Sequence, residues 1–251
     1  MAVSLASLKR GRNVRPPRIV IYGPHGLGKS SFGASAPAPV FIQTEDGLGT
    51  LDVTSFPLAQ TFADVNGALS TLYTDDHEFS TVVIDSADWL EPLIWKETCA
   101  LHGKADIEEF GYGKGYGFAL DQWRSVLSGL NALRDTKNMA SIVTAHCQIK
   151  RFDSPEVEPY DRYTPKLHNS ASALLQEWAD AVFFTNWKTV IQKEDVGFNK
   201  KVARGVTTGQ RMMYTTEKPA YLAKNRYSLP EEMDLSWQAF ADALTASAAQ
   251  T

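Results

Sequence analysis

The chain has 251 residues, a hydrophobic fraction of 43% and a formal net charge of -4, which suits one large α/β domain with a substantial core. Its two cysteines lie far apart and outside any C-x-x-C spacing, which excludes a disulfide framework or zinc site and favours a reducing, cytoplasmic setting. No apolar run approaches about 18 residues, and no apolar stretch follows the N-terminal bases, so we expect neither a transmembrane helix nor a signal peptide.

Charge is distributed unevenly along the chain. Residues 41–110 hold fourteen acids and two bases, whereas residues 187–226 hold nine bases and three acids. Residues 1–18 hold five bases and no acid. The basic segments suit either a partner with a phosphate backbone or pairing with the acidic half, for instance across a subunit interface. Charge alone leaves both interpretations open.

The first predicted strand, residues 18–22, leads into an octet that fits G-x-x-x-x-G-K-[ST], and a short helix is expected over residues 30–35. Glycines let successive backbone N–H groups point at one phosphate chain at a helix N-terminus. We therefore predict a nucleoside triphosphate site, with Lys29 on the β- and γ-phosphates and the Ser30 hydroxyl on Mg²⁺. The candidate binding residues are Gly23, Pro24, His25, Gly26, Leu27, Gly28, Lys29, Ser30 and Ser31.

Strands and helices alternate after this loop. Apolar runs predict strands over 39–43, 81–85, 140–145 and 181–185, and helical spacing predicts helices over 62–73, 88–102, 118–136 and 235–246. This alternation predicts an α/β fold with a mainly parallel sheet and right-handed crossovers. Short β-prone pieces at 188–193, 200–207, 211–216 and 219–224 predict antiparallel strands toward the C-terminal edge. We expect one domain spanning 1–251, with a basic arm over 1–15 and a C-terminal helix and frayed tail over 236–251.

Two segments interrupt the alternation. Residues 103–117 contain four glycines in seven positions together with aromatic and basic residues, and residues 147–169 are polar with three prolines. Long loops inside compact α/β domains are usually functional or disordered. We expect both segments to be loops.

Acidic residues follow two of the predicted strands. Asp85 ends the strand over 81–85, where a carboxylate holds the Mg²⁺ shell in the Walker B arrangement. Glu45 and Asp46 follow the strand over 39–43, and hydrolysis needs a carboxylate that orients the attacking water. Glu45 is the favoured candidate over Asp46, and a turn role for this acidic pair beside Gly47 is the alternative.

Three further residues are candidates for chemistry. His146 closes the strand over 140–145, where a polar side chain can contact the γ-phosphate, although a lone histidine is often structural. Lys224 and Arg226 alternate on a predicted strand, which places both cations on one face. They can stabilise transition-state charge in a neighbouring subunit or form a solvated basic edge.

This order of elements resembles the RecA/DnaB-type ATPases, and especially the minimal phage RecA-like ATPases associated with single-strand annealing and recombination. The resemblance covers roughly residues 15–235. In it, residues 41–45 resemble the strand that carries the catalytic glutamate, residues 82–86 the Walker B strand, and residues 223–226 the K-x-R finger of hexameric helicases. His146 stands where recombinases place a glutamine, which departs from the pattern. A RecA-like fold is thus implied.

The resemblance implies ATP and Mg²⁺ as cofactors, ATP hydrolysis, and a homo-oligomeric ring or filament with single-stranded DNA along its inner face. It further implies a phage protein in the bacterial host cytosol and recombination factors, such as a single-strand-binding protein, as accessory partners. The two loops occupy the places of the family's DNA-binding loops, where aromatic residues stack on bases and cations contact phosphates, or where the aromatic residues simply pack. The candidates are Phe110, Tyr112, Lys114, Tyr116, Lys150, Arg151, Arg162 and Lys166.

Three other functions fit the same motifs. A nucleotide-regulated annealing module would bind ATP without needing hydrolysis, and a hexameric translocase or helicase-loading ATPase would show directional, DNA-stimulated turnover. A small-molecule kinase also uses a P-loop, but the sequence shows no convincing lid or acceptor site. We therefore predict an ATP-dependent recombination protein that binds single-stranded DNA and promotes annealing or strand pairing.

Overall fold

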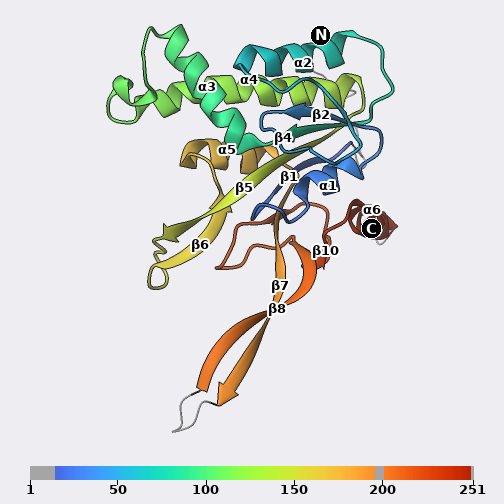
Figure 1. Cartoon of the computed structure of the whole chain (residues 1–251), viewed down its shortest axis with the longest axis vertical. Helices are drawn as coiled ribbons and strands as arrows, with labels where there is room; N and C mark the ends of the chain where they lie inside the picture. The colour runs from blue at the N-terminus through green and yellow to red at the C-terminus, as the bar shows by residue number, and fades with distance from the viewer. Residues whose placement is uncertain (1–14, 196–200, 250–251) are drawn as a thin grey trace, which may run out of the picture.

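A mainly parallel sheet forms the centre of the computed structural model, which describes residues 15–195 and 201–249. Its parallel strands are β1 (Arg18–Gly23), β2 (Pro39–Gln43), β3 (Thr54–Ser55), β4 (Thr81–Asp85), β5 (Ala140–Phe152) and β7 (Ala181–Asp195). They lie in the order β7-β1-β5-β4-β2-β3, so the strand that leads into the P-loop has neighbours on both sides (Figure 1). The predicted strands are confirmed, and β3 is an additional edge strand.

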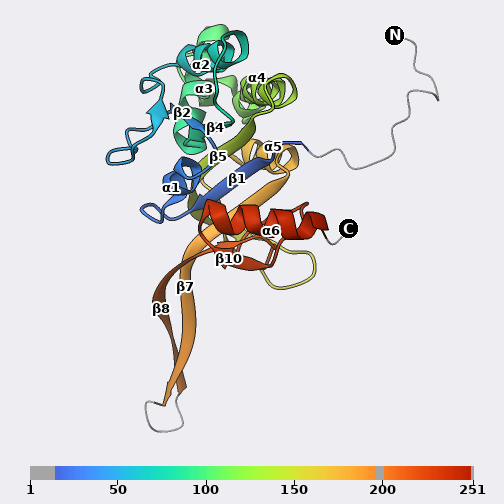
Figure 2. The same ribbon diagram turned by 90° about the vertical axis from the view of Figure 1, so that its right-hand side faces the viewer.

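Helices cover both faces of the sheet. One apolar cluster joins Val20 and Tyr22 of β1 to α2 (Phe62–Thr74), α3 (Ala87–Leu101), α4 (Lys114–Thr136) and α5 (Asn169–Trp178). The alternate residues Ile19 and Ile21 face a second cluster with α1 (Lys29–Ala34) and α6 (Trp237–Ala249). Figure 2 shows α6 beside β10, away from α2 and α4. In the part of the chain that the structure describes, no helix combines the length and apolar character needed to cross a membrane.

Antiparallel strands extend the sheet beyond β7. They are β8 (Lys201–Tyr214), β9 (Lys224–Asn225) and β10 (Glu232–Asp234). The predicted fold class, a mainly parallel sheet flanked by helices with antiparallel strands toward the C-terminal edge, is confirmed. The prediction of four short strands after residue 187 was wrong in number and length, because this region forms the continuous strands β7 and β8, of 15 and 14 residues. Only two residues near the last piece form a strand.

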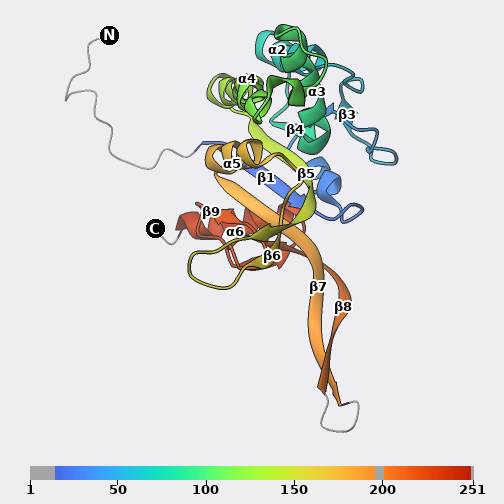
Figure 3. The ribbon, with the colours of Figure 1, turned by 90° about the vertical axis from the view of Figure 1, so that its left-hand side faces the viewer.

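The outer parts of β7 and β8, residues 189–195 and 201–207, pair with each other and project away from the rest of the chain as a two-stranded arm (Figure 3). A register shift between Trp187 and Thr189 marks the point where the hairpin leaves the sheet. A bulge of this kind bends a hairpin and increases its twist. The arm therefore begins just beyond the edge of the sheet at which the P-loop lies.

The two expected loops are largely ordered. Residues 107–110 form a short 3₁₀ helix, η2 (Ile107–Phe110), and α4 begins at Lys114, four residues before the predicted start. In the second segment, β5 continues to Phe152 and pairs with β6 (Tyr160–Pro165). The loop predictions were wrong in this respect. Gly111 and Gly113 adopt positive φ just before α4, and Pro155 and Pro159 lie in the connection between β5 and β6, so the breaking residues lie mostly between regular elements.

Candidate nucleotide-binding and catalytic site

The predicted P-loop connects β1 to α1 at the carboxyl edge of the sheet. Leu27 is fully buried and anchors the loop, and Gly28 adopts the left-handed conformation with φ of 105°. Only glycine fits at Gly23, because a Cβ there would lie 2.3 Å from the carbonyl oxygen of Thr185. Packing against β7 thus requires the first glycine of the motif, and backbone conformation favours the later one.

Lys29 points back into this loop. Its side chain is buried, and its ammonium donates hydrogen bonds to the carbonyl oxygens of Gly23, at 3.1 Å, and Pro24, at 2.9 Å. Burial lowers the pKa of Lys29, while the nearby carboxyl groups of Asp85 and Asp88 oppose this shift. A cation held within the loop is in position to contact phosphates that the loop surrounds.

Asp85 lies at the end of β4, two strands from β1. It is 3% exposed, and the hydroxyl of Thr144 on β5 donates a hydrogen bond to its carboxylate. The neighbouring Ser86 hydroxyl is also buried and has no hydrogen-bond partner among the described residues. These hard oxygen donors fit Mg²⁺, which keeps several waters and takes phosphate oxygens as ligands. Ser30 and Asp85 would hold the ion.

Glu45 is fixed beside Asp85 by its neighbour Thr44. The Thr44 hydroxyl donates to the carbonyl oxygen of Ser86 at 2.6 Å and accepts from its N–H at 2.8 Å. The backbone N–H of Thr44 also donates to the Asp85 carbonyl at 2.8 Å. The ends of β2 and β4 are therefore joined. Sequence reasoning missed this role of Thr44, because a threonine before an acidic pair carries no distinctive signal.

His146 of β5 also lies at this site. The prediction that His146 closes its strand was wrong, because β5 continues to Phe152, but the pairing of His146 with Gly23 places it beside the P-loop. Its Nδ1 lies 2.9 Å from Asp88 Oδ2 and 3.9 Å from Glu45 Oε2, and its backbone N–H donates to Asp88 Oδ1 at 2.9 Å. Asp88 is in the first turn of α3 and its side chain is 3% exposed. The prediction did not include Asp88. Its spacing of three residues after Asp85 was the available signal.

The protonation of these groups follows from their surroundings. Burial favours the neutral form of Asp88, but hydrogen bonds from His146 outweigh it and lower the pKa of the carboxyl group. Since Asp88 is an ionised acceptor, the Nδ1 of His146 donates to it, which leaves Nε2 free. Burial raises the pKa of Glu45, with His146 opposing the shift and Asp85 and Asp88 adding to it. A raised carboxylate pKa suits a general base.

Two adjoining clefts open at this edge. One of ≈ 600 Å³ is lined by Pro24, His25 and His146, and another of ≈ 700 Å³ is lined by Glu45 and Asp46. Trp89 and His146 line both clefts. Asp46 is exposed and makes no hydrogen bond or ion pair with any residue described, so the geometry favours Glu45 as the carboxylate near water. The clefts place solvent next to Glu45 and the P-loop.

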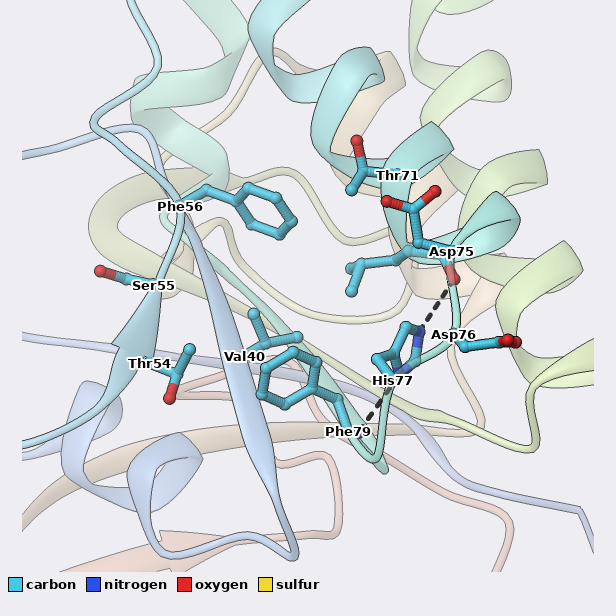
Figure 4. A pocket seen from close by; sticks show the side chains of 10 residues that line it. Val40, Thr54, Ser55, Phe56, Thr71, Asp75, Asp76, His77 and Phe79 are labelled. Carbon is cyan, nitrogen blue, oxygen red and sulfur yellow. Dashed lines mark hydrogen bonds between the residues drawn. The ribbon is translucent and has the colours of Figure 1, made fainter.

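A separate cavity of ≈ 270 Å³ lies near the opposite edge, between β2, β3 and the end of α2 (Figure 4). Phe56 and Phe79 form apolar walls, and Asp75 and Asp76 lie at its rim. Both ring nitrogens of His77 are occupied by backbone groups, Leu72 O at 2.9 Å and Phe79 N–H at 3.2 Å. This cavity is remote from the P-loop and is not part of the candidate site.

The residues predicted to contact DNA divide into free and engaged side chains. Tyr112 is fully exposed and Lys114 and Lys166 are exposed, whereas the exposed Arg151 lies 3.6 Å from the carboxylate of Asp153. The other candidates have partners within the chain. The Lys150 ammonium donates to Asn169 Oδ1 at 2.8 Å, the Arg162 guanidinium stacks 3.8 Å from the Phe152 ring centroid and bonds Glu217, and Phe110 packs against His102 and Phe118. The free side chains remain the better candidates.

The two predicted loop segments contact each other through Tyr116. Its ring stacks on His168 with centroids 4.0 Å apart, and its hydroxyl bonds Glu108. The backbone N–H of His168 donates to Glu91, a buried residue of α3. Tyr116 therefore packs within the domain, which was the alternative interpretation of the aromatic residues. Burial raises the pKa of Glu91 to about 7.

This shift predicts a pH-dependent stability. Between about pH 4.5 and 7 the unfolded Glu91 carboxyl ionises while the folded one stays protonated, so the free energy of unfolding falls as pH rises. We expect this contribution to reach about 3 kcal/mol. In Glu91→Gln the fall should be absent, which urea denaturation at several pH values measures. Parallel pH profiles for wild type and variant would contradict the shifted pKa.

Lys224 and Arg226 lie at the amino edge of the sheet, opposite the P-loop. The Lys224 ammonium donates to three carbonyl oxygens at the end of α5, those of Gln176, Glu177 and Ala179, at 2.6–3.1 Å. Arg226 is 54% exposed and lies 3.5 Å from Asp180, directly before β7. Neither cation can reach its own P-loop, so a finger role requires a neighbouring subunit. Only Arg226 has an exposed head group for it.

Lys224→Met tests the helix-capping contact. We expect the free energy of unfolding to fall by about 1–2 kcal/mol, because three carbonyl oxygens of α5 lose a charged donor. Urea denaturation of the isolated chain measures this. Lys218→Met is the control, since the Lys218 ammonium forms an exposed ion pair with Glu231, and its loss should lower the free energy of unfolding by under about 1 kcal/mol. An equal effect of both changes would argue against capping.

Comparison with known proteins gives one family match. A family model described as an AAA domain matches residues 15–227. Among solved structures, the chain is similar to the RadB recombinase, with a TM-score of 0.45 and 15% identity over 80% of each chain. This likeness is too distant to assign a function. No curated protein matches the sequence.

Proposed function

Because the chain belongs to the AAA domain family of P-loop ATPases, we propose that it binds ATP with Mg²⁺ in the P-loop cleft and hydrolyses it. One observation carries this proposal. The parallel strands β1, β2, β4 and β5 bring Lys29, Glu45, Asp85 and His146 to one edge of the sheet core, beside clefts open to solvent. A strand-end carboxylate, a loop lysine and a base with a raised pKa together suit phosphoryl transfer to water.

Each of these residues has a separate role in the proposed hydrolysis. Lys29 neutralises charge on the phosphates, while Glu45 orients the attacking water and accepts its proton. Asp88 holds the His146 ring through Nδ1, and since His146 lines both clefts, its Nε2 is the atom that can contact the terminal phosphate or the water. Bound Mg²⁺ supplies charge neutralisation at the phosphate oxygens.

We extend the proposal to recombination of the phage type, through single-stranded DNA binding by a homo-oligomer. The free side chains of Tyr112, Lys114 and Lys166 support it, because an exposed aromatic ring with cations on the same segments suits stacking and phosphate contacts. Arg151 is also exposed, although it pairs with Asp153. The stacked pair Tyr116 and His168 joins the two segments that carry these residues. Arg226 is the candidate for completing a neighbour's site.

Binding of a fluorescent single-stranded oligonucleotide tests the DNA proposal. With Mg²⁺ and a non-hydrolysable ATP analogue, we expect affinity that falls steeply with salt. The double change Lys114→Gln, Lys166→Gln should reduce the salt dependence by about one to two phosphate contacts. Lys137→Gln is the matched control, because Lys137 ends α4 away from these segments and bonds the Asp75 carbonyl oxygen. Salt-independent or absent binding would contradict the proposal.

The activity on DNA is tested separately. We expect faster annealing of complementary strands with ATP present, and no directional strand displacement. Directional displacement would instead assign the chain as a translocase, and annealing that persists unchanged in Glu45→Gln would assign a module that does not need hydrolysis.

A further inference from the structure

Arg211 of β8 packs against the P-loop of its own chain. Its Nη1 donates to the Leu27 carbonyl oxygen at 3.3 Å, and it lies 2.8 Å from the position that a Cβ on Gly28 would take. The register explains this approach, because Arg211 pairs with Trp187, two residues beyond Thr185, which itself packs on Gly23. Arg211, at the base of the arm, thus packs along one side of the P-loop.

Among the residues that the structure describes, no carboxylate pairs with the guanidinium of Arg211. Seven other arginines whose side chains the structure describes each lie within 4.0 Å of a carboxylate: Arg15, Arg18, Arg124, Arg134, Arg151, Arg162 and Arg226. Arg211 is the exception in this set, and its side chain is exposed. Its one hydrogen bond uses a neutral carbonyl and a single N–H of the five that a guanidinium carries. The remaining donors are available to an anion.

The position of Arg211 determines which part of a nucleotide it can contact. Strand β1 lies between β5 and β7, so Arg211 approaches the loop from the β7–β8 side, whereas Asp85, Glu45 and His146 approach from the β4–β5 side. Gly28 belongs to the part of a P-loop whose N–H groups cradle the α- and β-phosphates. Arg211 is therefore remote from the groups assigned to hydrolysis.

From this geometry we propose that Arg211 is a nucleotide-binding residue that contacts the α- or β-phosphate in cis. The inference rests on the proposed nucleotide site. It assigns Arg211 to binding and not to the chemical step, so ATP and ADP should depend on it equally. It also gives the projecting arm a direct connection to the nucleotide, because Arg211 lies on the strand that continues into the arm.

Arg211→Ala tests this assignment. We expect the Kd values for ADP and ATP to rise together by roughly 10- to 100-fold, which corresponds to the loss of a charge-assisted hydrogen bond. Inorganic tripolyphosphate, which lacks base and sugar, should lose the same factor as a competitor. Arg211→Lys should recover part of the affinity. Lys188→Ala is the charge-matched control, since Lys188 lies on the neighbouring strand and faces Glu232 at 3.4 Å.

Thermal unfolding separates phosphate contact from simple bracing of the loop. Phosphate contact predicts an unchanged Tm without nucleotide and a smaller rise on adding ADP. A Tm that falls without nucleotide, with an unchanged ADP-induced rise, would overturn the proposal in favour of bracing. Unchanged affinity in Arg211→Ala alongside lost binding in Lys29→Ala would overturn this inference and leave the proposed function standing. Unchanged binding in both variants would remove the proposed nucleotide site itself.

Discussion

Glu45→Gln is expected to lower ATP turnover by at least about 100-fold while ATP affinity stays within about threefold of wild type. Removal of a general base typically costs 10²–10⁴ in rate. Glutamine keeps the shape of the side chain and can still accept a hydrogen bond, but it cannot take a proton from water. The half-buried position of Glu45, 3.9 Å from His146, is retained by the bonds of Thr44.

Asp46→Asn provides the matched control for this variant. Asp46 follows Glu45 directly and lines the same cleft, but it is exposed, so its loss should change turnover by less than about threefold. Steady-state phosphate release with parallel ATP titrations measures both. In wild type, kcat should fall on acidification through a pKa above the ordinary value of 4.5, since burial raises the pKa of Glu45. Equal activity of the two variants would remove Glu45 from the chemistry.

Lys29→Ala is expected to weaken ATP and ADP binding by about 100-fold or more. Among the described residues, the ammonium is buried within the loop and its hydrogen bonds go to loop carbonyl oxygens alone. Its positive charge therefore acts on a ligand that the loop surrounds. Loss of one partner from a desolvated charge pair costs about 2–5 kcal/mol. Calorimetric titration of each nucleotide measures the effect.

Lys96→Ala controls for the loss of positive charge near the site. Lys96 is exposed and lines the cleft beside Glu45, away from the loop, and its removal should change affinity by less than about threefold. If Lys29→Ala binds ATP as tightly as wild type, the assignment of the P-loop is wrong.

Local patterns in the sequence were sufficient to predict the centre of this fold. Residues 18–35 combine a buried strand, a glycine loop and a helix start, all of which are determined by neighbours in the chain. The strands over 39–43 and 81–85 are apolar throughout, as expected when helices cover both faces of a parallel sheet. Since these two strands are parallel to β1, the acidic residues Glu45 and Asp85 at their carboxyl ends lie at the same edge of the sheet as the P-loop.

Contacts between distant segments were not predictable in the same way. The clamp of Asp88 on His146 joins residues 58 positions apart, and the contact of Arg211 with Leu27 spans 184. Neither Asp88 nor Arg211 belongs to a motif that the sequence analysis recognised. Lys224 lies on a strand as predicted, but its ammonium caps α5, because the pairing of residues 224–225 with β7 brings it beside the helix end.

ATP turnover with and without single-stranded DNA, at low and high salt, tests the central claim most directly. The measurement uses the full chain with Mg²⁺, and Lys29→Ala gives the background rate. We predict measurable turnover that single-stranded DNA increases, with the increase lost at high salt because phosphate contacts are screened. Turnover no faster than that of Lys29→Ala, or a rate indifferent to DNA at every salt concentration, would contradict the assignment of a DNA-linked ATPase.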